Sequence, residues 1–239
     1  MNVGHLRNYG VAFSDAESHW PKELKAQMAR QARAVIFGQL RPFEIGRFLV
    51  AFLKAKWRAR GVDLSLIRAK GMNNEALLAQ QIEYLTVFSA LAEVLGTNRA
   101  VEVMKRVMDA TAREALLLCM PDPAEVRGLG DPMEVFREYL RAGPEASCKA
   151  GCLDMRIGED RAGVFQFEIT WCVWLELARV LGVPEGCLPN CYADDLVFPD
   201  YFRSLGIRYH RSQTLACGGS MCDFRFEKMK AGPSPAESL

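Results

Sequence analysis

The chain has 239 residues, of which 50% are hydrophobic and 25% are charged, and its formal net charge is +1. This length and apolar fraction support a sizeable core without disulfide or metal crosslinks. The charge balance argues against a nucleic-acid-binding protein, which usually carries a basic excess on one face, and it is compatible with a small specific pocket.

The ends and the apolar runs of the chain bear on its compartment. The N-terminal MNVGHLRNYGVAFSDAES contains no apolar segment of signal-peptide length. The longest unbroken apolar runs, 48–53 and 115–120, are far shorter than the ~20 residues that span a bilayer. We therefore expect a cytoplasmic protein with no membrane partner, whose eight cysteines stay reduced and are mostly small buried hydrophobes.

Helical spacing dominates residues 1–125, which we expect to form a helical region. A helix is predicted over 43–57, ended by Gly61, with a basic face that is solvated. Its apolar stripe is Phe43, Ile45, Phe48, Leu49, Phe52 and Leu53, and its basic face is Arg47, Lys54 and Arg58.

Three further helices and a loop follow in chain order. One helix is predicted over 74–95 with Gly96 as its stop, and the next runs from a cap at 97 or 98 to Cys119. Prolines and glycines over 121–130 indicate a loop. Asp131 and Pro132 then begin a short helix that Gly143 closes.

Beyond about residue 148 the hydrophobic period changes from helical to two. Alternation over 153–157 and 165–170 predicts a β-hairpin, and a helix is predicted over 172–181. A polar loop, two more strands over 207–215 and 222–227 joined by CGGSM, and a disordered tail over 231–239 complete the chain. The predicted class is α+β: a helical N-terminal half packed with a C-terminal antiparallel sheet of about four strands, in regions 1–125 and 126–239 of one compact domain.

Familiar catalytic motifs such as the Walker P-loop, GxSxG and HExxH are missing from the sequence. The segment CYADD instead places Cys191 next to the adjacent carboxylates Asp194 and Asp195. Such a pair could bind a cationic amidine or a metal, or act as a general base. The alternative is that both aspartates cap a short helix that continues toward Tyr201.

Two further segments near the C-terminus carry candidate side chains. In CDFRF, strand alternation places Cys222 on the face of Phe224 and Phe226, and Asp223 on the other face. A thiol there is either a core residue or a nucleophile. The segment HRSQTLACGGS supplies His210, Arg211 and Thr214 beside a glycine pair that lets backbone amides approach a ligand, or it is only a hairpin connection.

Cysteine spacing leaves a zinc site open as a weaker alternative. Cys187 and Cys191 are separated by three residues, and Cys217 and Cys222 by four. This spacing departs from the usual short cysteine knuckle, and four thiolates would have to converge. We expect no metal and no cofactor.

In order, FEITWC ending at Cys172, CYADD, and HRSQTLACGGSMCDFRF resemble the L-2-amino-thiazoline-4-carboxylic acid hydrolase family. The resemblance covers the C-terminal ~75 residues of the chain well, and the run from Thr214 to Phe226 is its most specific element. It implies a small-molecule hydrolase that opens a C–N bond in a cyclic amidine such as a 2-aminothiazoline carboxylate.

The resemblance also implies roles for the candidate residues. Ring opening requires a nucleophile, for which Cys222 or Cys191 is available, or a water activated by a carboxylate. The partner or base is among Asp194, Asp195 and Asp223, and His210 could lower the pKa of a thiol. Arg211 is the expected clamp for the substrate carboxylate, with Thr214 and Cys172 as further substrate-binding residues.

A second class of function stays open at this point. A neutral α+β protein with aromatic-rich strands could be a non-catalytic sensor that binds a small molecule, a metal or a tetrapyrrole. A purely structural interaction protein is a third possibility. The protein could also assemble as a homo-oligomer.

Overall fold

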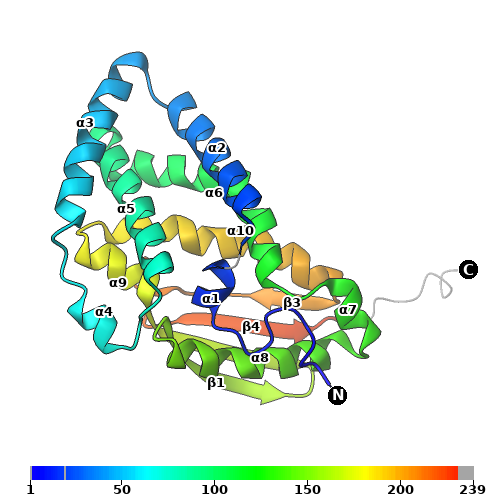
Figure 1. Ribbon diagram of the computed structural model, residues 1–239. Coiled ribbons are helices and arrows are strands. Elements are labelled where there is room, and N and C mark those ends of the chain that lie inside the picture. Colours follow the sequence, from blue (N-terminus) through cyan, green and yellow to red (C-terminus); the bar gives the residue numbers. More distant parts are fainter. Residues whose placement is uncertain (1, 19, 231–239) are drawn as a thin grey trace, which may run out of the picture.

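The computed structural model of the protein describes residues 2–18 and 20–230, so the predicted disorder of the tail over 231–239 lies outside the described residues (Figure 1). Helices fill the chain up to residue 149, and strands occur only after it, as predicted. The helices of this part are α1 (Phe13–Ser18), α2 (Lys22–Gly38), α3 (Pro42–Ala59), α4 (Ser65–Ala69), α5 (Glu75–Leu95), α6 (Thr97–Cys119), α7 (Pro123–Gly128) and α8 (Pro132–Lys149).

The ends of the long helices follow the predicted signals. The side chain of Asn74 accepts a hydrogen bond from the backbone N–H of Leu77 at 3.0 Å and so begins α5. Gly96 ends α5 with a φ of 83°, a backbone conformation that residues with a Cβ rarely adopt. Helix α6 begins at the next residue, so α5 and α6 meet at a sharp corner.

Four antiparallel strands form one sheet in the order β1-β2-β4-β3, which confirms the predicted α+β class. The strands are β1 (Leu153–Arg161), β2 (Val164–Cys172), β3 (Ile207–His210) and β4 (Cys222–Lys228). Hairpin β1–β2 is followed in the sheet by β4, which pairs with β2 on one side and with β3 on the other. The site residues on β4 therefore lie in the middle of the sheet.

One face of the sheet is apolar and covered by helices. Phe167 of β2 stacks on Phe224 of β4 with ring centroids 4.8 Å apart. Phe136 of α8 and Phe202 of helix α10 (Leu188–Ser204) pack on each other and on Phe226. The core that contains these rings also draws buried residues from α5, so the helical half and the sheet are packed together.

The segment after β2 corrects the predicted polar loop. Short helix α9 (Val173–Val180) is followed by the 3-10 turn η1 (Pro184–Cys187) and then by α10. The predicted loop with Cys191, Asp194 and Asp195 is therefore the first part of a helix, and neither aspartate caps one. The apolar face of α10 consists of residues spaced four apart, which are buried: 189, 193, 197 and 201. This periodicity is hard to recognise in the sequence because the segment also contains two prolines and two adjacent aspartates.

Prolines and glycines led to two wrong predictions about where helices end or are absent. Helix α8 was predicted to close at Gly143, but it continues through Pro144 to Lys149 because this turn packs against β1, and Pro144 itself is buried. The predicted loop over 121–130 contains the short helix α7, which begins at an Asp122 cap with a proline in its first turn.

Strand β3 is shorter than predicted. It ends at His210, and residues 211–214 leave the sheet. The Asp223 carboxylate accepts hydrogen bonds from the backbone N–H groups of Ser212 and Gln213 at 2.9 and 2.8 Å, which satisfies donors that a longer strand would have paired. A short 3-10 turn, η2 (Leu215–Cys217), then leads back to β4.

Helix α3 buries a different face from the predicted one. Of the predicted stripe, Phe48 is buried, whereas Phe43, Leu49 and Leu53 are exposed. Helical spacing identified an apolar face, but α3 is apolar on two faces, and the face that carries Phe48 packs against α5 and against Phe37 of α2. Within the described residues, no helix of the protein is both long and apolar enough to cross a membrane.

Candidate functional site

Cys172 occupies the junction of β2 and α9. It is the last residue of β2, where it pairs with Leu153, and it is also the N-cap residue of α9. Cys172 as a whole residue is half-buried. A thiol at the N-terminus of a helix faces backbone N–H groups and the positive end of the helix dipole, an arrangement that favours the thiolate.

The thiol of Cys187 is the neighbour that most affects Cys172. Hydrogen bonding from the Cys187 side chain lowers the pKa of Cys172, and burial raises it. The backbone N–H groups of Leu175 and Trp174 lower it further, so the pKa of Cys172 lies below the ordinary 9.0. Hydrogen bonds to Cys172 and Cys191, together with burial, keep the pKa of Cys187 well above its ordinary value. Cys187 therefore retains its proton and donates it toward Cys172.

A second group, next to the thiols, is built around Arg211. Its guanidinium donates to Asp194 Oδ2 at 2.9 Å, to Asp195 Oδ2 at 2.7 Å and to the Cys191 carbonyl oxygen at 2.6 Å. The Arg211 side chain is only 3% exposed and lies over the Phe224 ring at 5.2 Å. It fixes the first turns of α10 to the segment after β3.

Asp194 is a carboxyl group of this cluster whose pKa is raised toward neutrality. Burial raises the pKa of Asp194 to about 6, although the charge of Arg211 lowers it, and Asp195 adds a smaller increase. The charge of Asp194 in turn acts on Cys172 and Tyr209, so these groups belong to one electrostatic neighbourhood. A carboxyl group that titrates near neutral pH can both donate and accept a proton there.

Cys222 lies beside these groups but in an apolar setting. It is buried, and its Sγ accepts a hydrogen bond from the backbone N–H of Leu215 at 3.3 Å. Burial raises the pKa of Cys222 to about 12, with smaller effects from Cys191, Cys172 and Arg211. This setting disfavours a thiolate at Cys222.

The other predicted residues lie at the edge of this cluster or outside it. Asp223 accepts hydrogen bonds from the backbone N–H groups of Ser212 and Gln213. Burial alone would raise the pKa of Asp223, but these hydrogen bonds outweigh it, and the pKa is lowered. Thr214 is buried, and its hydroxyl accepts a hydrogen bond from the Cys217 backbone. His210 is exposed and pairs with Arg225, on the sheet face opposite the aromatic core.

Tyr84 of helix α5 was not among the predicted residues. Its hydroxyl oxygen is buried and has no hydrogen-bond partner among the described residues. Burial raises the pKa of Tyr84 well above its ordinary value, with further contributions from Cys187 and Cys191, so the hydroxyl lies near these thiols and stays protonated. A buried hydroxyl without a partner is costly, and it commonly marks a position that a water or ligand fills.

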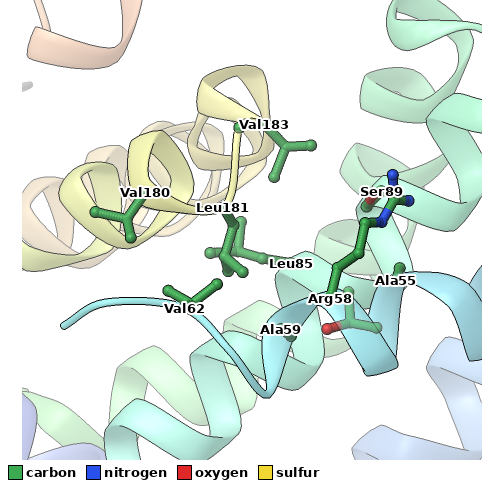
Figure 2. Close-up of a pocket in the computed structure, with 11 residues that line it drawn as sticks. Ala55, Arg58, Ala59, Val62, Leu85, Ser89, Val180, Leu181 and Val183 are labelled. Carbon is green, nitrogen blue, oxygen red and sulfur yellow. The ribbon is translucent and has the colours of Figure 1, made fainter.

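A pocket of about 270 Å³ lies at the other end of α9 (Figure 2). Figure 2 shows Val180, Leu181 and Val183 facing Arg58 on α3 and Leu85 on α5 across it. None of the predicted site residues lines this pocket. In the described residues, no group of three or more histidine, cysteine, aspartate or glutamate side chains is arranged to hold a metal, and all eight cysteines are free thiols.

The predicted resemblance is confirmed by comparison with known families. The family model described as L-2-amino-thiazoline-4-carboxylic acid hydrolase matches residues 76–226, more than half of the chain. The match begins near the start of α5 and so extends well upstream of the predicted motifs to include Tyr84. No curated protein matches the chain. The matched segment runs from α5 to β4 and includes the cluster around Cys172, which consists of Cys172, Cys187, Cys191, Asp194, Asp195 and Arg211. The chain therefore belongs to the L-2-amino-thiazoline-4-carboxylic acid hydrolase family.

Proposed function

We propose that the protein is a hydrolase that opens the C–N ring bond of a small cyclic amidine, such as a 2-aminothiazoline carboxylate, at the cluster around Cys172. The family name suggests hydrolase activity on a thiazoline carboxylate. The observation that carries the proposal is the pairing of a cysteine whose pKa is lowered, Cys172, with a nearby carboxyl group that titrates at about 6, Asp194. Nucleophile and proton-transfer group are thus neighbours.

Cys172 is the proposed nucleophile, in place of Cys222 or Cys191. Its thiolate attacks the ring carbon that lies between the sulfur and the two nitrogens. The bond from this carbon to the ring nitrogen then breaks, and the nitrogen leaves as an amine with a proton from Asp194. Water attacks the same carbon, gives a proton to Asp194 and displaces the Cys172 thiolate. One water is consumed, and the product is a thiocarbamate with a free amine.

Cys187 and Tyr84 support this chemistry through their retained protons. The Cys187 thiol donates toward Cys172 and so favours the thiolate before attack. The buried Tyr84 hydroxyl has no partner in the part of the chain that the structure describes, and we assign it to a hydrogen bond with the substrate or with the tetrahedral intermediate. A preorganised donor of this kind stabilises charge that develops at the reacting carbon.

Arg211 is assigned to positioning the carboxylates. Its guanidinium already donates to Asp194, Asp195 and the Cys191 carbonyl, and its side chain is 3% exposed. A substrate carboxylate would have to displace these partners. Asp223 and Thr214 hold the backbone of the segment after β3, next to Arg211, and therefore keep it in place.

The test is turnover of 2-aminothiazoline-4-carboxylate by the purified full chain, followed by mass spectrometry as a product heavier by one water. Cys172→Ser is expected to lower the rate by about a thousandfold or more, because a serine hydroxyl is not ionised near neutral pH. Cys148→Ser is the matched control, because Cys148 is exposed on α8 and its thiol contacts the backbone of Met155 on β1. Its rate should equal that of the unaltered protein.

The same experiment separates the proposed mechanisms. Turnover that survives in Cys172→Ser but is lost in Asp194→Asn would replace the covalent route by a water that the carboxylate activates. No turnover with several cyclic amidines, together with a visible absorbance band of the purified protein, would contradict the hydrolase proposal and favour the tetrapyrrole-binding alternative.

A further inference from the structure

Helix α3 presents a broad apolar surface to solvent. Within the described residues, half of the exposed large hydrophobic side chains belong to this helix, with Phe43 59%, Leu53 66% and Trp57 74% exposed. Figure 1 shows α3 along the outer edge of the molecule, far from the sheet. Single exposed hydrophobic residues are ordinary, but a contiguous row of large ones indicates a binding surface.

The exposed side chains form one stripe along the helix. Phe43, Val50, Leu53 and Trp57 are separated by seven, three and four positions and therefore lie on one side of the α-helix, with Gly46 on the same side between the first two. The opposite side carries the buried Phe48, Ala51 and Ala55 and packs on α5. At 1.5 Å per residue, the 18 residues of α3 give the stripe a length of roughly 27 Å.

Basic residues border the stripe along both of its edges. At 100° per residue, Arg47, Lys54 and Arg58 follow one edge, and Lys56 and Arg60 follow the other. All of these side chains are exposed.

The single acidic residue of α3 is removed from this surface. Glu44 is buried, and its carboxylate accepts a hydrogen bond from the Arg41 backbone N–H at 2.7 Å. Glu93 of α5 lies 3.8 Å from Lys54 and 3.5 Å from Arg58, but both pairs are solvent-exposed and therefore weak. The stripe is thus an apolar surface bordered on both edges by positively charged side chains.

We propose that α3 docks on an anionic lipid surface, with Phe43, Val50, Leu53 and Trp57 inserted at the boundary between headgroups and acyl chains. An amphipathic helix with tryptophan, phenylalanine and leucine on one face and flanking lysine and arginine is suited to this interface. The basic edges contact lipid phosphates, so attraction is electrostatic as well as apolar. The helix lies on the membrane and does not cross it.

Charge favours lipid over a second copy of this chain on the same surface. Two α3 stripes packed face to face would bring the basic edges of one helix against the basic edges of the other. Like charges at such positions oppose pairing. The expectation of no membrane partner rested on the short apolar runs of the sequence, which bear on helices that cross a membrane and not on a helix that lies on its surface.

The experiment is co-sedimentation of the full chain with vesicles of phosphatidylcholine alone and of phosphatidylcholine mixed with phosphatidylglycerol. We expect binding to the mixed vesicles only, and release at high salt, because salt screens the attraction. Trp57→Glu should weaken binding by about tenfold or more, since it removes apolar contact and adds a repelled charge. Lys56→Gln should weaken it by about fivefold.

Matched controls separate this surface from general stickiness. Ile157→Glu changes an exposed apolar residue on β1 and should leave vesicle binding unchanged. Equal binding to both vesicle types, or no binding to either, would overturn the proposal. So would a concentration-dependent dimer, measured by light scattering, that Trp57→Glu dissociates, because a second copy would then be the occupant.

Discussion

The cluster around Cys172 and the outer face of α3 depart from ordinary folding preferences in opposite directions. The cluster removes charged groups from water, and the Arg211 side chain there is only 3% exposed. Helix α3 leaves large apolar groups in water, and Trp57 is 74% exposed. Burying charged groups and exposing large apolar groups each lower the stability of a fold unless another interaction compensates.

The two regions also differ in what would relieve that cost. The charges of the cluster are compensated within the protein, by one arginine between two carboxylates. The exposed apolar side chains of α3 have no such compensation within residues 2–18 and 20–230, and in our proposal a lipid surface supplies it. The comparison suggests that the cluster is a preorganised site and α3 a docking surface. Changes in the cluster should therefore alter folding stability strongly, and changes on α3 hardly at all.

The largest effect on stability is expected from Arg211→Met. This change leaves Asp194 and Asp195 next to each other without their shared cation. The Arg211 side chain is buried but the Asp195 side chain is 53% exposed, so we expect a cost of about 3 kcal/mol, at the lower end of the range for breaking a buried pair. Arg208→Met on the same region of the chain is the control, because Arg208 is exposed and should change stability by less than about 0.5 kcal/mol. Urea unfolding measures both. Equal effects would mean that the Arg211 group is not a buried, compensated cluster.

A pH-dependent contribution is expected from Asp194. Its pKa in the folded state, about 6, is above the ordinary 3.8, so the folded protein holds this proton more firmly than the unfolded chain. Its stabilising contribution is therefore present at low pH and is lost as pH rises from about 4 to about 6, by roughly 3 kcal/mol at most.

The measurement is urea unfolding of the unaltered protein and of Asp194→Asn across this pH range. The difference in unfolding free energy between the two should change between about pH 4 and pH 6 and be constant above it. A constant difference throughout would place the pKa of Asp194 near its ordinary value.

Asp223→Ala is expected to have an intermediate effect. It removes the acceptor for the backbone N–H groups of Ser212 and Gln213, and unsatisfied groups of this kind cost about 1–3 kcal/mol. Asp223→Asn keeps a carbonyl oxygen and should restore most of the loss. If both variants unfold at the same urea concentration as the unaltered protein, Asp223 does not hold the segment after β3.

Tyr84→Phe is expected to have the smallest effect on stability, and of opposite sign. The change removes a buried hydroxyl without a partner, so stability should stay equal or rise by up to about 1 kcal/mol. Turnover should nevertheless fall by about tenfold if the hydroxyl contacts the reacting substrate. A variant that is destabilised would show that the hydroxyl has a partner in solution, such as a bound water.

The sequence predicted those features that depend on local periodicity. The alternation over 165–170 and the glycines after the long helices were sufficient for the first hairpin and for the ends of α5 and α9. The family resemblance rested on motifs near the C-terminus, and it was confirmed. The cluster residues Cys172, Cys191, Asp194 and Arg211 were all named from these motifs.

Features that depend on distant neighbours could not be predicted in this way. Helix α10 was read as a loop because its prolines and paired aspartates conceal an apolar face that is visible only against α6. Tyr84 lies 103 positions before Cys187 in the sequence, and no local pattern links them. On α3 the spacing showed apolar faces, but only the position of α5 decides which of them is covered.

The central claim is that Cys172 is the nucleophile, and titration of its thiolate tests it most directly. The ultraviolet absorbance of thiolate is measured against pH for the unaltered protein and for Cys172→Ser, and the difference isolates this thiol. We predict a difference that develops below pH 9.0, the ordinary thiol value, because Cys187 and the first turn of α9 stabilise the thiolate. A difference that develops only above pH 9.0 would contradict the assignment of Cys172.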